Sequence, residues 1–382
     1  MGAQVRVIAD RQPRRQLALA VPRRWELRIR FESEGSLDRG QVIMKLFAVA
    51  FAGTALTLLA QAPNVNSGNN MSGFDVPALG FVSSETPPQL QPILGIPGSA
   101  RLGTPLPLPS TANQIRIAPG QTYALVQQEP GSPLSLVLLR GISSQTQHLT
   151  LTPIPGAISQ VDLVAFSPTG LSVVIYSRQT NQLQVLTCFP NSPQVFLTLP
   201  NLSTVDTPQK LAVSDDAQAV LIADGAGSVY SLSPHASPVL VHNSPEISSL
   251  AFVTQSRDAI ICDRTLNAVL FLQHSSTVPV PLAPRMNNTC QPEAATSTAD
   301  GKTILVACAA QHAVLSIDRA SGVTRVYNVT NSPSTLDRLS VRDAFLMSPP
   351  EGGTYWLFVW QPDGPSTFFV AATRNTGQGS GN

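Results

Sequence analysis

Short apolar runs separated by turn residues recur along most of the chain, and the clearest copy lies at Glu293–Arg319. Its runs Ile304–Val306 and Val314–Ile317 are each of strand length and too short for an independent helix. The preceding Ala299–Gly301 contains Asp-Gly, where Asp bonds its own backbone and Gly accepts positive φ. The pattern therefore predicts a strand, a tight turn, a strand, a short loop and a third strand.

The same unit recurs, and its anchors are Ile115–Gly120, Leu163–Gly170, Leu211–Asp216, Leu250–Val253, Thr298–Lys302 and Ala344–Ser348. From Ser214 to Val253 to Thr298 the offsets are 39 and 45 residues, the range of four-stranded propeller blades. We predict an all-β chain that forms one β-propeller of antiparallel blades over residues 90–375. Six blades are expected, and seven stay open because Ile93–Ile96 could add another strand.

An outer-strand pattern at Leu106 and Leu108 precedes the first anchor, so it has no inner partner on its own side. We predict that this N-terminal strand pairs with the last blade, whose inner strands come from residues 343–371, and closes the ring. A closed ring leaves no long free sheet edge.

Residues 1–62 show a different pattern. Met44 and Lys45 are followed by the uncharged Leu46–Leu59 and then by Ala60-Gln61-Ala62. This pattern predicts a secretory signal peptide at residues 44–62, with an uncleaved membrane anchor as the alternative. Residues 1–43 then indicate a misassigned start site, or else an extended arginine-rich targeting segment. We expect residues 63–89 to be a flexible leader and residues 376–382 a flexible tail.

Charge narrows the range of partners. Residues 1–62 hold 10 of the 24 basic and 5 of the 23 acidic side chains, so residues 63–382 carry a net charge of −4. Without a basic patch, nucleic acid and anionic lipid are poor partners. We expect an exported, periplasmic or extracellular monomer with no membrane span after signal cleavage. Its partner, an unidentified protein or small molecule, would bind the face formed by two sets of loops: those that join an outer strand to the next blade and those between the second and third strands of a blade.

Export permits disulfides, and the chain has four cysteines. Extending the hairpin centred on Asp300 brings residues near 290 opposite residues near 308, so we predict a Cys290–Cys308 disulfide. Cys188 and Cys262 fall in different blades and are expected to be buried free thiols.

Candidate chemistry is sparse. Asp224 and Asp263 lie 39 residues apart, the blade offset, so matching loop carboxylates could hold a hard cation such as calcium. The competing interpretation is that each ends a strand and bonds the loop backbone. The five histidines are isolated, and no Gly-x-Ser-x-Gly motif occurs. We predict no catalytic residue and no cofactor, and whether the chain is an enzyme stays open.

The stretch Thr298–Ala307, followed by Ala313–Asp318 and Gly322, resembles the repeat of bacterial Tyr-Val-Thr-Asn (YVTN) propellers: Ser-Pro-Asp-Gly-Lys, an apolar strand, then Val-x-x-Ile-Asp. That resemblance implies a fold shared by lactonase-like, haem-d1-binding and surface-layer proteins, and no lactonase or haem-ligand residue can be carried over. The leading hypothesis is an exported, non-catalytic binding or scaffold module at the bacterial cell envelope. The alternative is a lactonase-like or other hydrolase with a cation over the central channel.

Overall fold

The computed structural model describes residues 77–85, 87–129, 136–143, 149–274, 276–282, 290–351, 354–361 and 363–371. They all belong to the compact unit Asn70–Asn382. The predictions for residues 1–43, 44–62 and 376–382 lie outside the described residues. Throughout the described ranges the secondary structure is β-strand and turn, and no helix is found there, so none of these residues forms a helix able to cross a membrane.

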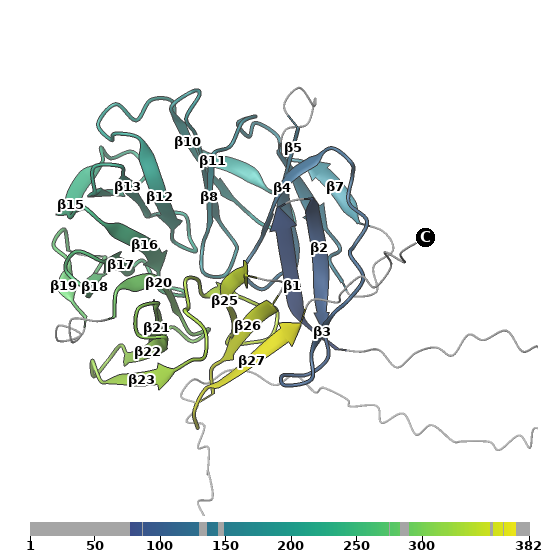
Figure 1. Ribbon diagram of the computed structural model, residues 1–382. Helices are drawn as coiled ribbons and strands as arrows, with labels where there is room; N and C mark the ends of the chain where they lie inside the picture. The colour runs from purple at the N-terminus through teal and green to yellow at the C-terminus, as the bar shows by residue number, and fades with distance from the viewer. Residues whose placement is uncertain are drawn as a thin grey trace, which may run out of the picture. The chain divides into compact units, whose positions relative to one another are not determined.

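In the described part of the chain, twenty-seven strands form seven antiparallel sheets, six of four strands and the first of three (Figure 1). We number the sheets blades 1 to 7 in chain order. Blade 1 comprises β1 (Ala78–Glu85), β2 (Pro88–Leu94) and β3 (Arg101–Leu102). Blade 2 comprises β4 (Ala112–Ile117), β5 (Tyr123–Gln128), β6 (Leu136–Arg140) and β7 (Thr150–Pro153). Blade 3 comprises β8 (Leu163–Phe166), β9 (Val173–Ser177), β10 (Gln182–Thr187) and β11 (Gln194–Leu199).

Blades 4 and 5 comprise β12 (Pro208–Val213), β13 (Val220–Asp224), β14 (Ser228–Leu232), β15 (Val239–Asn243); β16 (Ile247–Phe252), β17 (Ala259–Asp263), β18 (Ala268–Leu272), β19 (Val280–Pro281). Blades 6 and 7 comprise β20 (Pro292–Ser297), β21 (Thr303–Cys308), β22 (Ala313–Asp318), β23 (Thr324–Asn328); β24 (Asp337–Arg338), β25 (Ala344–Glu351), β26 (Thr354–Val359), β27 (Ser366–Ala371).

Apolar packing joins the blades into a closed ring. Seven clusters of buried side chains each combine residues of two neighbouring blades. The cluster that joins the ends of the chain packs Leu79 and Leu102 of blade 1 with Leu339 and Leu357 of blade 7. Figure 1 shows β3 and β27 side by side at this seam, in agreement with their contacts. The all-β propeller is therefore confirmed.

Within the described residues the ring has seven blades rather than six, and none of the described N-terminal strands enters the last blade. All four strands of blade 7 come from residues 337–371, because β24 supplies the inner strand that the sequence pattern missed. β24 is two residues long and both are charged, so it carries no apolar signal. The N-terminal residues instead build blade 1, and β1 lies within the segment expected to be a flexible leader.

Prolines explain why blade 1 stops at three strands. Beyond β3 the chain stays alongside β2, since the N–H of Leu106 donates to the carbonyl of Leu90 (2.8 Å). In an extended segment the backbone groups of neighbouring residues point to opposite edges. Pro105 and Pro107 flank Leu106, so they leave the outer edge without the N–H groups that another strand would need.

Candidate functional site

The two candidate aspartates occupy matching positions, each at the end of the second strand of its blade. Asp224 ends β13, and its Oδ1 accepts hydrogen bonds from the N–H groups of Ala226 (3.0 Å) and Ser228 (2.8 Å). Its exposed fraction is 7%. This carboxylate therefore holds the turn between β13 and β14 in shape, as the competing interpretation expected.

Asp263 ends β17 and is fully buried. Its Oδ1 accepts hydrogen bonds from the Ser244 hydroxyl (2.9 Å) and the Leu266 N–H (2.8 Å), and its Oδ2 lies 2.8 Å from His242 Nε2. His242 and Ser244 come from the end of blade 4, so Asp263 ties two blades together. Sequence spacing could not find His242, because only the packing of β15 against the next blade places it there.

One chain segment links the surroundings of both aspartates. Asn243, between His242 and Ser244, donates from Nδ2 to the Ser228 hydroxyl (3.2 Å), and Ser228 donates its N–H to Asp224. Among the described residues no group of three or more His, Cys, Asp or Glu side chains is placed to hold a metal ion. His148 lies outside the described residues.

Cys290 and Cys308 form a disulfide with a Cα–Cα distance of 4.7 Å. It fastens the chain entering β20 to the end of β21. Cys262 is buried in the same core cluster, and burial, with the nearby charges of Glu293 and Asp263, raises the pKa of its thiol to about 12. Cys188 is exposed, so the expectation that it is buried was wrong, because it lies in the turn after β10 rather than within a strand.

Hydrogen bonds at the turns between first and second strands cross every junction of the ring, and we call them the turn belt. Its contacts are Gln121 Oε1 with Phe81 N, Tyr123 Oη with Gly170 O, Asp215 with Thr169 and Gln255, Thr254 with Ser297, Asp343 with Ala299, and Ser340 Oγ with Leu79 O. The belt closes the same ring as the core clusters, independently of apolar packing.

Asp215 is the most connected carboxylate of the belt. Oδ1 accepts hydrogen bonds from the N–H (2.8 Å) and hydroxyl (2.5 Å) of Thr169 in blade 3, and Oδ2 accepts one from the N–H of Gln255 in blade 5 (2.8 Å). A residue of blade 4 thus spans three blades. The sequence predicted the turn but gave no sign of this second role.

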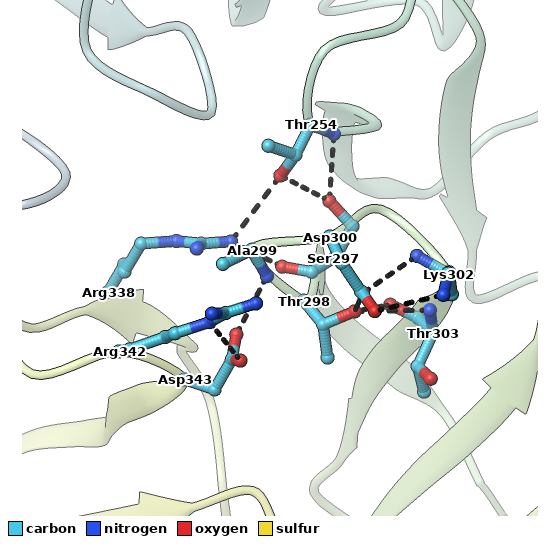
Figure 2. Close-up of polar contacts among 10 residues, drawn as sticks. All are labelled: Thr254, Ser297, Thr298, Ala299, Asp300, Lys302, Thr303, Arg338, Arg342 and Asp343. Carbon is cyan, nitrogen blue, oxygen red and sulfur yellow. Dashed lines mark hydrogen bonds and ion pairs between the residues drawn. The ribbon is translucent and has the colours of Figure 1, made fainter. Parts of the chain in front are cut away.

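Arg338 reaches across the belt from blade 7. Its guanidinium donates to the Ser297 carbonyl in blade 6 and to the Thr254 hydroxyl in blade 5 (3.5 Å), as Figure 2 shows. Burial lowers the pKa of Arg338, whereas the negative charges of Asp343 and Asp215 raise it. In Figure 2 the Asp343 side chain points to the Ala299 N–H beside it. These groups give one mouth of the ring a dense polar lining.

Asp337 lies on the inner strand of blade 7. The residue as a whole is exposed, but the neighbouring protein excludes part of the water around its carboxyl. That surrounding protein raises the pKa of Asp337, while a hydrogen bond with Thr335 and the charge of Arg116 lower it. Arg116 is on β4, the inner strand of blade 2. The two charges therefore interact along the inner wall of the ring.

Comparison with known proteins gives the fold and no further assignment. No family model matches the chain, and no curated protein matches its sequence. The chain is similar to the crystal structure of a functionally unknown protein from Desulfotomaculum acetoxidans, with 13% identity and a TM-score of 0.52 over 78% of this chain and 100% of that one. At this identity the likeness supports the fold alone.

Two further structures are more distant. A virginiamycin B lyase from Staphylococcus aureus has 10% identity and a TM-score of 0.45, over 66% of this chain and 82% of that one. A chain of a nidogen/laminin complex has 11% identity and a TM-score of 0.40, over 66% and 93%. The fold and the site together define the chain as a seven-bladed β-propeller.

Proposed function

We propose that this chain is an exported, non-catalytic β-propeller that acts as a binding or scaffold module at the bacterial cell envelope. The observation that carries the proposal is that the carboxylates considered for a site accept hydrogen bonds from the protein itself. The candidate carboxylates Asp224 and Asp263, and Asp215 of the turn belt, each accept hydrogen bonds that brace a turn or a blade junction. A ring braced in this way is a rigid support for the loops that connect its strands.

Export is supported by the signal-peptide pattern at residues 44–62 and by the Cys290–Cys308 disulfide. The resemblance to YVTN-type propellers rests on Thr298–Asp318 and agrees with an envelope location. We expect the full-length gene, expressed in a bacterial host, to yield an envelope protein that begins at Pro63 and contains one disulfide. Intact mass after cell fractionation measures both. Ala60→Leu should block cleavage, and a reduced cytoplasmic product would refute export.

The binding role needs its own test, and blade 4 offers a matched pair of positions. Ala226 in the β13–β14 turn and Ala236 in the β14–β15 turn are both exposed and lie at opposite ends of β14. A photo-crosslinking residue at Ala226 should capture an envelope component in cells, whereas one at Ala236 should not. Equal capture, or none, would contradict a binding face on the loops that include Ala226.

Calorimetry separates this role from that of a cation-dependent hydrolase. Titration with calcium and zinc should give no binding that depends on the candidate aspartates. Micromolar binding that Asp224→Ala or Asp263→Ala abolishes would instead favour the hydrolase.

A further inference from the structure

A groove lies against the outer part of blade 6, beside the first residue after β26 of blade 7, with a volume of about 350 Å³. Trp360 and Val323 supply its apolar surface, and Asp318, Arg325 and Ser321 are among its polar residues. None of these takes part in the turn belt or surrounds Asp224 or Asp263. The groove is thus separate from the sites described above.

Strand register explains how these side chains meet. Ser316 pairs with Arg325, and Val314 pairs with Tyr327, so the four lie along one part of β22 and β23. Val314 packs in the core cluster shared with blade 7, and Trp360 packs at its margin. Trp360 meets Tyr327 edge to face, with ring centroids 5.7 Å apart. Apolar packing between the blades therefore passes into a polar groove at Trp360.

The charges in the groove narrow the class of ligand. Hydrogen bonds from the Ser321 hydroxyl (2.6 Å) and N–H (2.8 Å) hold the pKa of Asp318 below its usual value, so it is a carboxylate at neutral pH. Arg325 adds an exposed cation. The Asp318 carboxylate repels an anionic ligand, and the Arg325 guanidinium repels a cationic one. Both side chains can form hydrogen bonds with the hydroxyl groups of a neutral ligand.

We propose that this groove binds a neutral saccharide, with one sugar ring against Trp360 and its hydroxyl groups bonded to Asp318, Arg325 and Ser316. A pyranose has an apolar face and a rim of hydroxyls, which match an indole beside carboxylate, guanidinium and hydroxyl groups. The volume holds at least one sugar ring, and the open groove lets a longer chain continue past it. The groove is a second binding site, beside the β22–β23 turn and not on the loops that include Ala226, and the proposal rests on the binding role proposed above for the ligand's source.

The fluorescence of Trp360 can report whether a ligand is bound in the groove. The chain has three tryptophans, so Trp25→Phe with Trp356→Phe in the full-length protein leaves Trp360 alone. We expect cellotriose, maltotriose or chitotriose to change its fluorescence with a dissociation constant on the order of 1 mM. Arg325→Gln should weaken binding about tenfold, because it removes a charged donor. Arg101→Gln, on exposed Arg101 of blade 1, is the control and should change nothing.

Calorimetry on the unaltered protein repeats the titration without tryptophan substitutions. Absence of binding to all three trisaccharides at about 10 mM would overturn the proposal, as would unchanged affinity in Arg325→Gln. The crosslinking at Ala226 is independent of the groove. If Ala226 captures a component and no sugar binds, the groove proposal fails and the binding role stands. If a sugar binds and Ala226 captures nothing, the groove stands and the loop-face role fails.

Discussion

Asp215 illustrates how much one side chain of the turn belt contributes. It accepts hydrogen bonds from Thr169 and Gln255, which lie in the blades on either side of its own. Removing it would leave two backbone N–H groups without this acceptor, that of Gln255 in an exposed place and that of Thr169 in a partly buried one. The loss of an acceptor at such a site costs more than the net value of the hydrogen bond itself.

We expect Asp215→Ala to lower the free energy of unfolding by about 2–3 kcal/mol, since hydrogen bonds to a charged group are lost across two junctions. Its neighbour is a matched control. Asp216 is exposed, and its contact across a blade junction is an exposed ion pair with Arg257 (2.5 Å). Its Oδ1 accepts hydrogen bonds from the Ser214 hydroxyl (2.7 Å) and the Gln218 N–H (3.1 Å) within its own turn, so Asp216→Ala should cost about 1 kcal/mol. Urea titration followed by circular dichroism measures both. Equal costs would show that the cross-blade contacts of Asp215 contribute little.

The hydrogen bonding of Asp300 predicts how the stability of the fold changes as the pH falls. The Thr298 hydroxyl donates to its Oδ1 (2.7 Å), and this hydrogen bond is the main cause of its lowered pKa (Figure 2). A carboxyl whose pKa is lower in the folded chain stabilises the fold above its unfolded pKa, which is about 3.9. That contribution disappears as the pH falls through the folded pKa.

Asp300→Asn should therefore destabilise the protein at pH 7, and the deficit should be smaller at about pH 2, because the wild-type carboxyl takes up its proton only at acid pH. Urea midpoints at the two pH values provide the measurement. Asp363→Asn, in the connection before β27, controls for the change in net charge. A deficit of the same size at both pH values would mean that the turn depends on the shape of Asp300 and not on its charge.

At the scale of the element, local pattern predicted strands well where the turn had its own chemistry. Asp300 and Gly301 mark a hairpin, and Gly301 has φ of 67° in the structure. The units that begin at β4, β8, β12 and β20 were recognised from a turn that contains Gly or Asp, whereas the unit that begins at β16 was recognised from its apolar run Leu250–Val253. β24 was missed because Asp337 and Arg338 form a strand through pairing with β25 and have no apolar alternation.

In the candidate site, too, the sequence predicted what lies within one blade and missed the contacts between blades. The positions of Asp224 and Asp263 at strand ends follow from the blade offset, which is a property of the sequence. The contacts of His242 with Asp263 and of Arg338 with Thr254 join different blades, and the second spans 84 residues. Such contacts depend on the angle between blades, and no pattern within one blade contains that information.

The disulfide acts on one blade, and its effect can be estimated. Cys290 and Cys308 are 18 residues apart, and in the chain-entropy account closing a loop of this size stabilises the fold by about 3 kcal/mol. Cys290→Ser with Cys308→Ser should lose about that amount, and reduction of the wild type should match it. Cys188→Ser, at the exposed free cysteine, is the control. Equal urea midpoints for the double variant and the oxidised wild type would contradict a stabilising role.

At the scale of the whole molecule, the seam between blades 1 and 7 determines whether the ring unfolds as a unit. Leu339 is 2% exposed and packs with Leu79 in the seam cluster, and Leu79 O also accepts hydrogen bonds from Ser340 Oγ (2.8 Å) and Val341 N (3.3 Å). Leu250 is 8% exposed and packs between blades 4 and 5. Each leucine thus packs in the core cluster of one junction, Leu339 at the seam and Leu250 within the continuous chain.

Leu339→Ala and Leu250→Ala should each cost about 2–5 kcal/mol, because each leaves a cavity in a packed junction. In a closed ring the loss of one junction weakens the support of every blade. In a Trp25→Phe background the tryptophan fluorescence comes from Trp356 and Trp360 and reports on blade 7. Its change in urea should then coincide with the loss of circular dichroism of the whole chain. A seam that holds the ring weakly would give another result: Leu339→Ala would cost well under 1 kcal/mol, and blade 7 would lose its fluorescence signal before the remaining blades unfold.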